Sequence, residues 1–239
     1  STHCISSAAS DVYKRQVRDA LDCALGIAQK LGYQTSDDEG FVGIADIPGR
    51  GDKQLATICH VDVVPAGPGW NTDPFVMERR EGWLLGRGVI DDKGPAVLSL
   101  YAGAYLLKHG IVPRYTFRAL LGCDEEVGMS DVHHYLENHV DPDFLFTPDA
   151  EFPVCNAEKG QFGATFVSPK IDGGRIVSWS GAEASNAIPS QSICELAIDA
   201  DELPAPVENA DRLEITALDN GHAQILSLIH ISEPTRPER

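Results

Sequence analysis

Four short motifs place groups that can hold a metal ion at or just after apolar runs or glycine-bounded turns. His60 ends one apolar run, Asp91 lies in a turn between glycines, and Glu126 ends an acidic run. Asp149 follows another short apolar run. Imidazole and carboxylate groups are common ligands of zinc and related divalent ions. Because chance rarely supplies four such positions in order, the sequence predicts a metal site at the strand ends of an α/β sheet.

Two more acidic residues beside these candidates can assist the chemistry. Asp62 lies two positions after His60, and residues i and i+2 of a strand face the same side, so its carboxylate can orient the imidazole. Glu125 precedes Glu126, and adjacent carboxylates at a strand end point apart. One of them can therefore bind metal while the other takes a proton from a water molecule.

Each motif taken alone has a plainer alternative. A single histidine at a strand end is usually structural, either Asp91 or Asp92 can cap a helix, and the acidic run can be a solvated loop. Three further histidines are expected on the surface of a short helix, away from the site: His133, His134 and His139.

The strings that contain the four candidates resemble one enzyme family. They are HVDVVPAGPGW, GRGVIDDKGP, DEEVG and TPDAEFPVCNAEKG, with gaps of 31, 35 and 23 residues between successive candidates. From about residue 20 to residue 200 the chain is similar to the bacterial peptidase V dipeptidases. These belong to the zinc exopeptidase superfamily, with carnosinase, aminoacylase and carboxypeptidase G. The resemblance implies hydrolysis of dipeptides of the Xaa-His or β-Ala type by a metal-activated water, with two zinc ions that manganese or cobalt can replace.

The resemblance also implies how the ligands divide between the two metals. His60 and Asp149 are implied as ligands of one zinc ion and Glu126 as a ligand of the other. Asp91 is implied as the bridge between them, with a cis peptide bond after it.

Three other residues receive roles from the resemblance. Asp62 would orient His60, and Glu125 would be the general base and acid. Asn186 lies in a segment similar to the part of the lid that approaches the substrate terminus, although an Asn in a turn before a proline is the plainer alternative.

One family residue is not matched, namely the C-terminal histidine that binds the second zinc ion. His222 and His230 are poor candidates for it. We therefore expect an N-terminal part of such an enzyme that is inactive, or nearly so, by itself. Two alternatives stay open: an amidohydrolase of N-acyl amino acids from the same superfamily, and a metal-binding fragment without catalysis.

The apolar spacing predicts the elements that must position these residues. Helices are predicted over 17–31, 95–107 and 131–138, an alternating strand over 41–47, and further strands over 55–59, 115–121 and 144–146, of which the first and last are expected to be buried. Strands that alternate with helices indicate an α/β fold. The resemblance specifies a zinc-exopeptidase-type mixed sheet flanked by helices, followed by the start of an α+β lid domain.

The predicted domain organisation follows from these elements. Residues 17–160 are expected to form the N-terminal part of the catalytic zinc-peptidase domain, and residues 161–224 the beginning of the lid domain. Residues 1–16 and 225–239 resemble translated sequencing-adapter read-through and are expected to be non-native tails. A natural head and tail outside the core is the alternative.

Composition limits the partners. The 36 acidic against 19 basic side chains give a formal charge of -17, which opposes binding to nucleic acid or to an anionic membrane surface. Six scattered cysteines without a C-x-x-C pair fit reduced thiols, and we expect a cytoplasmic protein. The resemblance favours a monomer that acts on dipeptides.

Overall fold

The computed structural model describes residues 7–67, 69–151, 153–157, 160, 167, 174–181, 191–205 and 212–228, with side chains from residue 14 to residue 227. The chain divides by its internal contacts into two compact units, Ser1–Glu158 and Lys159–Arg239.

A five-stranded mixed sheet forms the centre of the first unit. Its order is β1-β2-β6-β3-β7. The strands are β1 (Gln34–Asp38), β2 (Val42–Ile47), β3 (Gln54–His60), β6 (Thr116–Gly122) and β7 (Phe144–Phe146). The first two pairings are antiparallel and the last two are parallel. The prediction of an α/β fold with a mixed sheet is confirmed.

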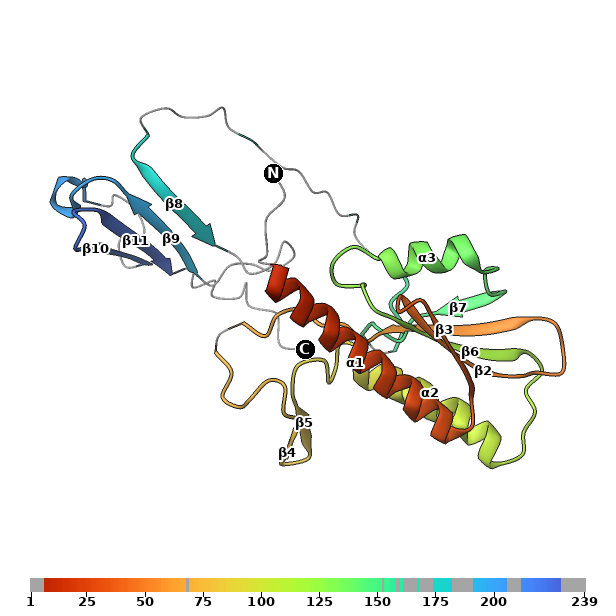
Figure 1. Ribbon diagram of the computed structural model, residues 1–239. Coiled ribbons are helices and arrows are strands. Elements are labelled where there is room, and N and C mark those ends of the chain that lie inside the picture. The colour runs from red at the N-terminus through yellow and green to blue at the C-terminus, as the bar shows by residue number, and fades with distance from the viewer. Residues whose placement is uncertain are drawn as a thin grey trace. The chain divides into compact units, whose positions relative to one another are not determined.

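Helices cover both faces of this sheet (Figure 1). They are α1 (Ser7–Leu31), α2 (Lys93–Lys108) and α3 (Ser130–Asn138). The first two share buried clusters with the strands on one face, whereas α3 packs Tyr135 against the other face. The sheet is therefore the middle layer of three.

The first helix shows why the local sequence folds as it does. Leu21, Leu25 and Ala28 recur at helical spacing and are buried against the sheet. Gly43 of β2 lies beneath them, and a Cβ atom at this position would lie 2.7 Å from a methyl group of Leu21. The helix ends before Gly32, whose φ of 97° a residue with a side chain rarely adopts.

The parallel connections bring three strand ends together. The chain passes from β3 through α2 to β6, and then through α3 to β7. A small hairpin, β4 (Glu78–Arg80) with β5 (Trp83–Leu85), lies between β3 and α2. Because β3, β6 and β7 are parallel, the residues that follow them meet at one edge of the sheet.

The structure corrects two expectations about burial. The residues of β7 were expected to be buried, but Phe144, Leu145 and Phe146 are 62%, 44% and 46% exposed because β7 is an edge strand. The segment 41–47 was expected to alternate between a buried and an exposed face. Instead most of β2 is buried on both faces, because helices cover both sides of this central strand.

The second unit contains an antiparallel sheet of four strands in the order β10-β11-β9-β8. They are β8 (Ile176–Gly181), β9 (Gln191–Leu196), β10 (Leu213–Ala217) and β11 (Ala223–Leu228), with a 3-10 turn at Ala200–Glu202. Parts of both terminal segments that the sequence set apart thus lie in regular elements, α1 and β11. Among the described helices, none combines the length and apolarity needed to cross a membrane.

Helix α2 offers a matched pair of leucines for testing the core. Leu100 is 1% exposed and Leu98 is 71% exposed. We expect Leu100→Ala to lower the free energy of unfolding by about 2–5 kcal/mol, because it leaves a cavity between helix and sheet. Leu98→Ala should change it by less than about 0.5 kcal/mol. Urea unfolding followed by circular dichroism measures both, and equal losses would contradict the packing described for α2.

Candidate metal centre

The predicted site residues gather where the strands end. His60 is the last residue of β3, and Glu125 and Glu126 lie in the loop after β6. Asp149 follows β7, and Asp91 lies two residues before the start of α2. Four separate segments of the first unit therefore contribute to one cluster.

The imidazole of His60 is the centre of the cluster. Its side chain is only 3% exposed, and its Nε2 atom lies 2.9 Å from Asp91 Oδ1 and 3.4 Å from Asp149 Oδ2. Glu125 Oε2 is 3.8 Å from the same nitrogen. One buried nitrogen thus faces carboxylates that come from three different loops.

Asp62 is fully buried on the other side of the ring. Its Oδ1 atom lies 3.2 Å from His60 Nδ1, and its backbone oxygen lies 3.1 Å from the same nitrogen. Its carboxylate also accepts the backbone N–H groups of Glu125 and Glu126, at 3.4 and 3.2 Å. Asp62 therefore links the histidine to the acidic loop after β6.

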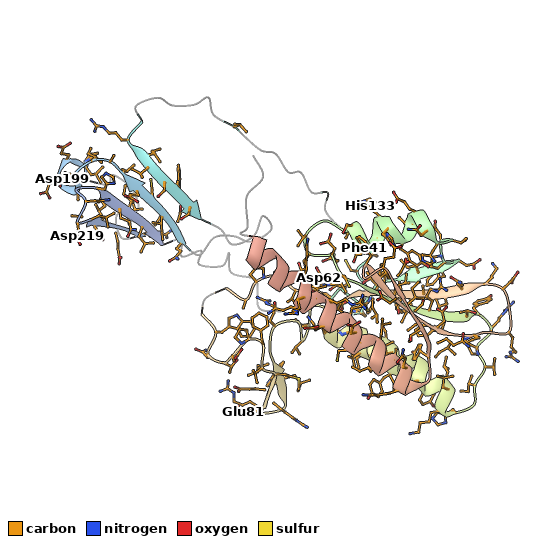
Figure 2. The ribbon with its side chains drawn as sticks, viewed as in Figure 1. Phe41, Asp62, Glu81, His133, Asp199 and Asp219 are labelled. Atoms are coloured by element: carbon orange, nitrogen blue, oxygen red, sulfur yellow. The ribbon has the colours of Figure 1, made fainter. Side chains whose placement is uncertain are left out.

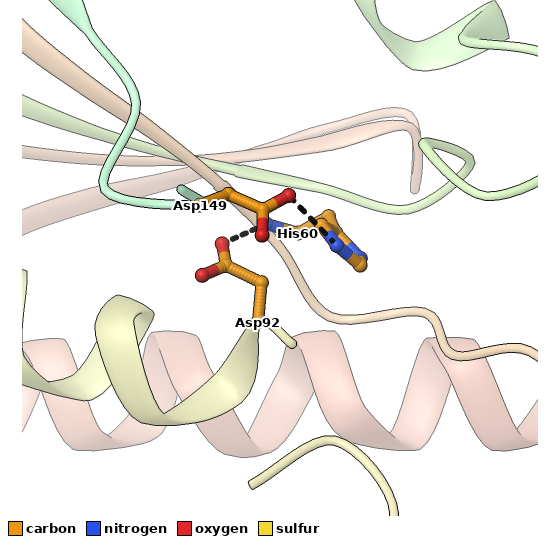
Figure 3. A group of neighbouring side chains, drawn as sticks. All are labelled: His60, Asp92 and Asp149. Atoms are coloured by element: carbon orange, nitrogen blue, oxygen red, sulfur yellow. Dashed lines mark hydrogen bonds and ion pairs between the residues drawn. The ribbon is translucent and has the colours of Figure 1, made fainter. Parts of the chain in front are cut away.

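Asp92 has a place that the sequence did not indicate. The alternative that it caps α2 is wrong for its side chain, which occupies the N-cap position without a capping hydrogen bond. The residue is fully buried, and its Oδ2 accepts the backbone N–H of His60 at 3.0 Å (Figure 3). Its Oδ1 has no hydrogen-bond partner within the described part of the chain. Only its position next to Asp91 could have drawn attention to it. The peptide bond between the two aspartates is cis, as the resemblance implied.

The donor atoms form two groups that can hold a metal ion. His60 combines with Asp92 and Asp149 in one group and with Asp91 and Glu126 in the other, with the donor atoms of each group within 4.8 Å of one another. One imidazole with several carboxylates is a donor set that suits zinc and related divalent ions. The residues present therefore fit a metal, and both groups depend on the same histidine.

The electrostatics of the cluster favour a cation. Burial raises the pKa of Glu125, Glu126 and Asp149, and neighbouring carboxylates add to the effect while His60 opposes it. Burial also raises the pKa of Asp92, to about 6. These shifts have one cause, because carboxylates withdrawn from water and crowded together disfavour their own ionised forms. A divalent ion would relieve that repulsion.

The histidine responds in the opposite sense. Burial on its own lowers the pKa of His60, but the surrounding carboxylates, above all Asp62, outweigh it and raise the pKa to about 10. Lys93 lies near the same carboxylates, yet burial lowers its pKa. The cluster thus attracts positive charge at its centre.

The other residues singled out in the sequence lie elsewhere. His133 is exposed on α3, whereas His134 and His139 are partly buried, with Nε2 atoms 3.4 and 2.8 Å from Asp38 Oδ2 (Figure 2). The expectation that all three are surface groups is therefore right only for His133. His222 lies in the second unit, with Nδ1 2.7 Å from Glu195 Oε1. Asn186 and His230 are outside the described residues.

Known proteins resemble this chain in sequence and in fold. The Beta-Ala-Xaa dipeptidase of Lactobacillus delbrueckii subsp. lactis is 40% identical over 149 residues, which are 62% of this chain and 32% of that protein. Human carnosine dipeptidase 1 superposes with a TM-score of 0.50 at 21% identity, over 59% of this chain and 34% of that structure, which shows a shared fold. The chain spans about one third of the length of the curated relatives that it matches.

A family model extends the comparison beyond single relatives. The model of peptidase family M20/M25/M40 matches residues 56–238, a span that includes every residue of the metal cluster. Since this match covers well over half of the sequence, the chain belongs to peptidase family M20/M25/M40.

Proposed function

We propose that the whole protein is a metal-dependent dipeptidase that hydrolyses short substrates of the Xaa-His or β-Ala type. The observation that carries this proposal is the gathering of metal-binding carboxylates around one buried histidine, with Glu125 Oε2 3.8 Å from its ring. The relationship to a Beta-Ala-Xaa dipeptidase supports the substrate class. Family membership supports the reaction class, which is peptide hydrolysis.

We assign the ligands by what their oxygen atoms already do. Asp92 Oδ2 accepts the amide of His60, whereas the Asp91 side chain is 54% exposed with Oδ1 2.9 Å from the imidazole. Asp91 is therefore the better bridge between two metal ions. His60 and Asp149 would complete one site, and Glu126 would belong to the other.

Glu125 is the proposed general base and acid. Two divalent ions, zinc or else manganese or cobalt, would lower the pKa of a water molecule and polarise the peptide carbonyl. Glu125 would take the proton of that water and then deliver it to the leaving amine. Its raised pKa supports this role, because a base that must also act as an acid needs a pKa nearer to neutrality than that of an exposed glutamate. Asp62 would keep the imidazole of His60 in one orientation.

The two metal sites are proposed to be unequal in the 239-residue chain. Both donor groups in its described part contain the same histidine, so two ions cannot each have an imidazole of their own. We propose that this chain binds one ion tightly and hydrolyses dipeptides weakly or not at all. This leaves a metal-binding fragment without catalysis as the description of the isolated chain, while an N-acyl amino acid amidohydrolase is the competing activity for the whole protein.

Several further properties belong to the same proposal. The charge of -17 supports a protein that binds neither nucleic acid nor anionic membranes. The scattered cysteines support a cytoplasmic location. We propose a monomer in which Asn186 contacts the substrate, and a lid domain that begins after residue 160.

Zinc binding to the 239-residue chain tests the metal site. After removal of metals with a chelator, isothermal titration calorimetry should show one tightly bound zinc ion per chain. His60→Ala should weaken binding by more than about 100-fold, since even loss of an outer partner of a ligand costs about 10- to 100-fold. His133→Ala, a change of the exposed histidine on α3, is the matched control and should bind as the unchanged chain does. Two tightly bound ions would contradict the unequal sites, and unchanged binding by His60→Ala would contradict the ligand assignment.

Substitution of Glu125 tests the mechanism in a version of the protein that spans the full length of the relatives. Glu125→Gln keeps the shape of the side chain but removes the base, so kcat for β-Ala-His should fall by about 10²- to 10⁴-fold. The zinc content, measured by atomic emission, should stay the same, because Glu125 is not a proposed ligand.

The control for this experiment is Glu137→Gln, a change of an exposed glutamate on α3, which should leave kcat unaltered. If the zinc content of Glu125→Gln falls together with kcat, Glu125 is a ligand and the assigned roles are wrong.

A further inference from the structure

The loop after β6 is held by a buried carboxylate that has no part in the proposed reaction. Asp131 lies in the first turn of α3 and is 1% exposed. Its Oδ2 accepts the backbone N–H groups of Cys123 and Asp124 at 2.7 and 2.9 Å, and its Oδ1 accepts that of Val132 at 2.7 Å. Both oxygens of this carboxylate are therefore used by backbone donors.

The end of β6 is shaped to admit this side chain. A Cβ atom at Gly122 would lie 2.3 Å from Asp131 Oδ2, so any larger residue there would displace the carboxylate. A buried carboxylate is costly unless hydrogen bonds replace its water, and bonds from N–H groups to an ionised oxygen are among the stronger ones in proteins. The contact between α3 and the strand end therefore depends on these three bonds.

Two buried aspartates together hold four successive amides of the loop. Asp131 accepts those of residues 123 and 124, and Asp62 accepts those of Glu125 and Glu126. The loop then closes on itself, because the backbone oxygen of Asp124 accepts the N–H groups of residues 128 and 129, at 3.2 and 2.7 Å. The backbone that carries the proposed base and the proposed ligand is thus tied down from within the protein.

We propose that Asp131 is a positioning residue for the metal site. It fixes the backbone of Cys123 and Asp124, and through it the direction in which Glu125 and Glu126 leave the sheet. This inference rests on the proposed function, because it matters only if Glu126 binds metal. Asp131 itself touches neither a donor atom of the cluster nor a substrate, and it acts through the loop.

Cobalt titration of the 239-residue chain, followed by visible absorption, tests the proposal. The unchanged chain should show a tight step from the site with His60 and Asp149 and a weaker step from the site with Glu126. Asp131→Asn keeps the size of the side chain but lacks the charge and one acceptor. We expect the weaker step to lose at least about tenfold in affinity, with a changed absorption spectrum, while the tight step stays within about twofold.

Asp143→Asn is the matched control. Asp143 Oδ2 also accepts a backbone N–H, that of Gln54 at 2.9 Å, but at the opposite end of β3. This variant should show both cobalt steps unchanged. The proposal is overturned if Asp131→Asn binds cobalt as the unchanged chain does. It is also overturned if both steps weaken equally, since that indicates a general loss of structure.

The other outcomes are separable as well. If the unchanged chain binds no cobalt, the proposed function fails, and this inference fails with it. If Asp131→Asn does not fold, amide hydrogen exchange of the unchanged chain decides the matter. The amides of residues 123–126 should then be protected as strongly as those of β6, and exchange at the rate of an open loop would refute the role of Asp131.

Discussion

A buried imidazole surrounded by carboxylates is the interaction on which the site depends. The ring of His60 can be almost fully buried only because Asp62 contacts one nitrogen while Asp91 and Asp149 approach the other. Those carboxylates come from separate segments, and the parallel order of β3, β6 and β7 brings most of them to one edge of the sheet. The fold therefore concentrates negative charge at a place from which water is largely excluded. Charge of that kind is stable when a cation shares it.

The support for this cluster is also made of carboxylates, but they act on the backbone. Asp92 accepts the amide of His60, while Asp62 and Asp131 accept the amides of the loop after β6. Backbone N–H groups at strand ends have lost their sheet partners, so they are available to such acceptors. The acidic residues of the site thus fall into two kinds. Some face the space where a metal would bind, and others hold the chain that carries them.

The sequence predicted the elements of the first unit well and the supporting residues poorly. Strand 144–146 was placed with its observed bounds, because a short apolar run between turn residues is a strong local signal. Its exposure was not predictable, since strand order decides which strand lies at an edge. Strand β1 was missed because QTSDD has no apolar pattern, and it forms through its pairing with β2. Asp92 and Asp131 look like ordinary helix-start residues in the sequence. Their burial becomes visible only when distant segments meet.

The most direct test of the account is where a metal ion binds in the folded chain. A crystal of the zinc-loaded protein, with anomalous scattering recorded at the zinc absorption edge, would show this. The account predicts a zinc ion bonded to His60 Nε2 at about 2.0–2.1 Å, with oxygen ligands from Asp91 and Asp149. A zinc ion bound instead by His134, His139 and Asp38, or one held at His60 by Asp92 without Asp91, would contradict it.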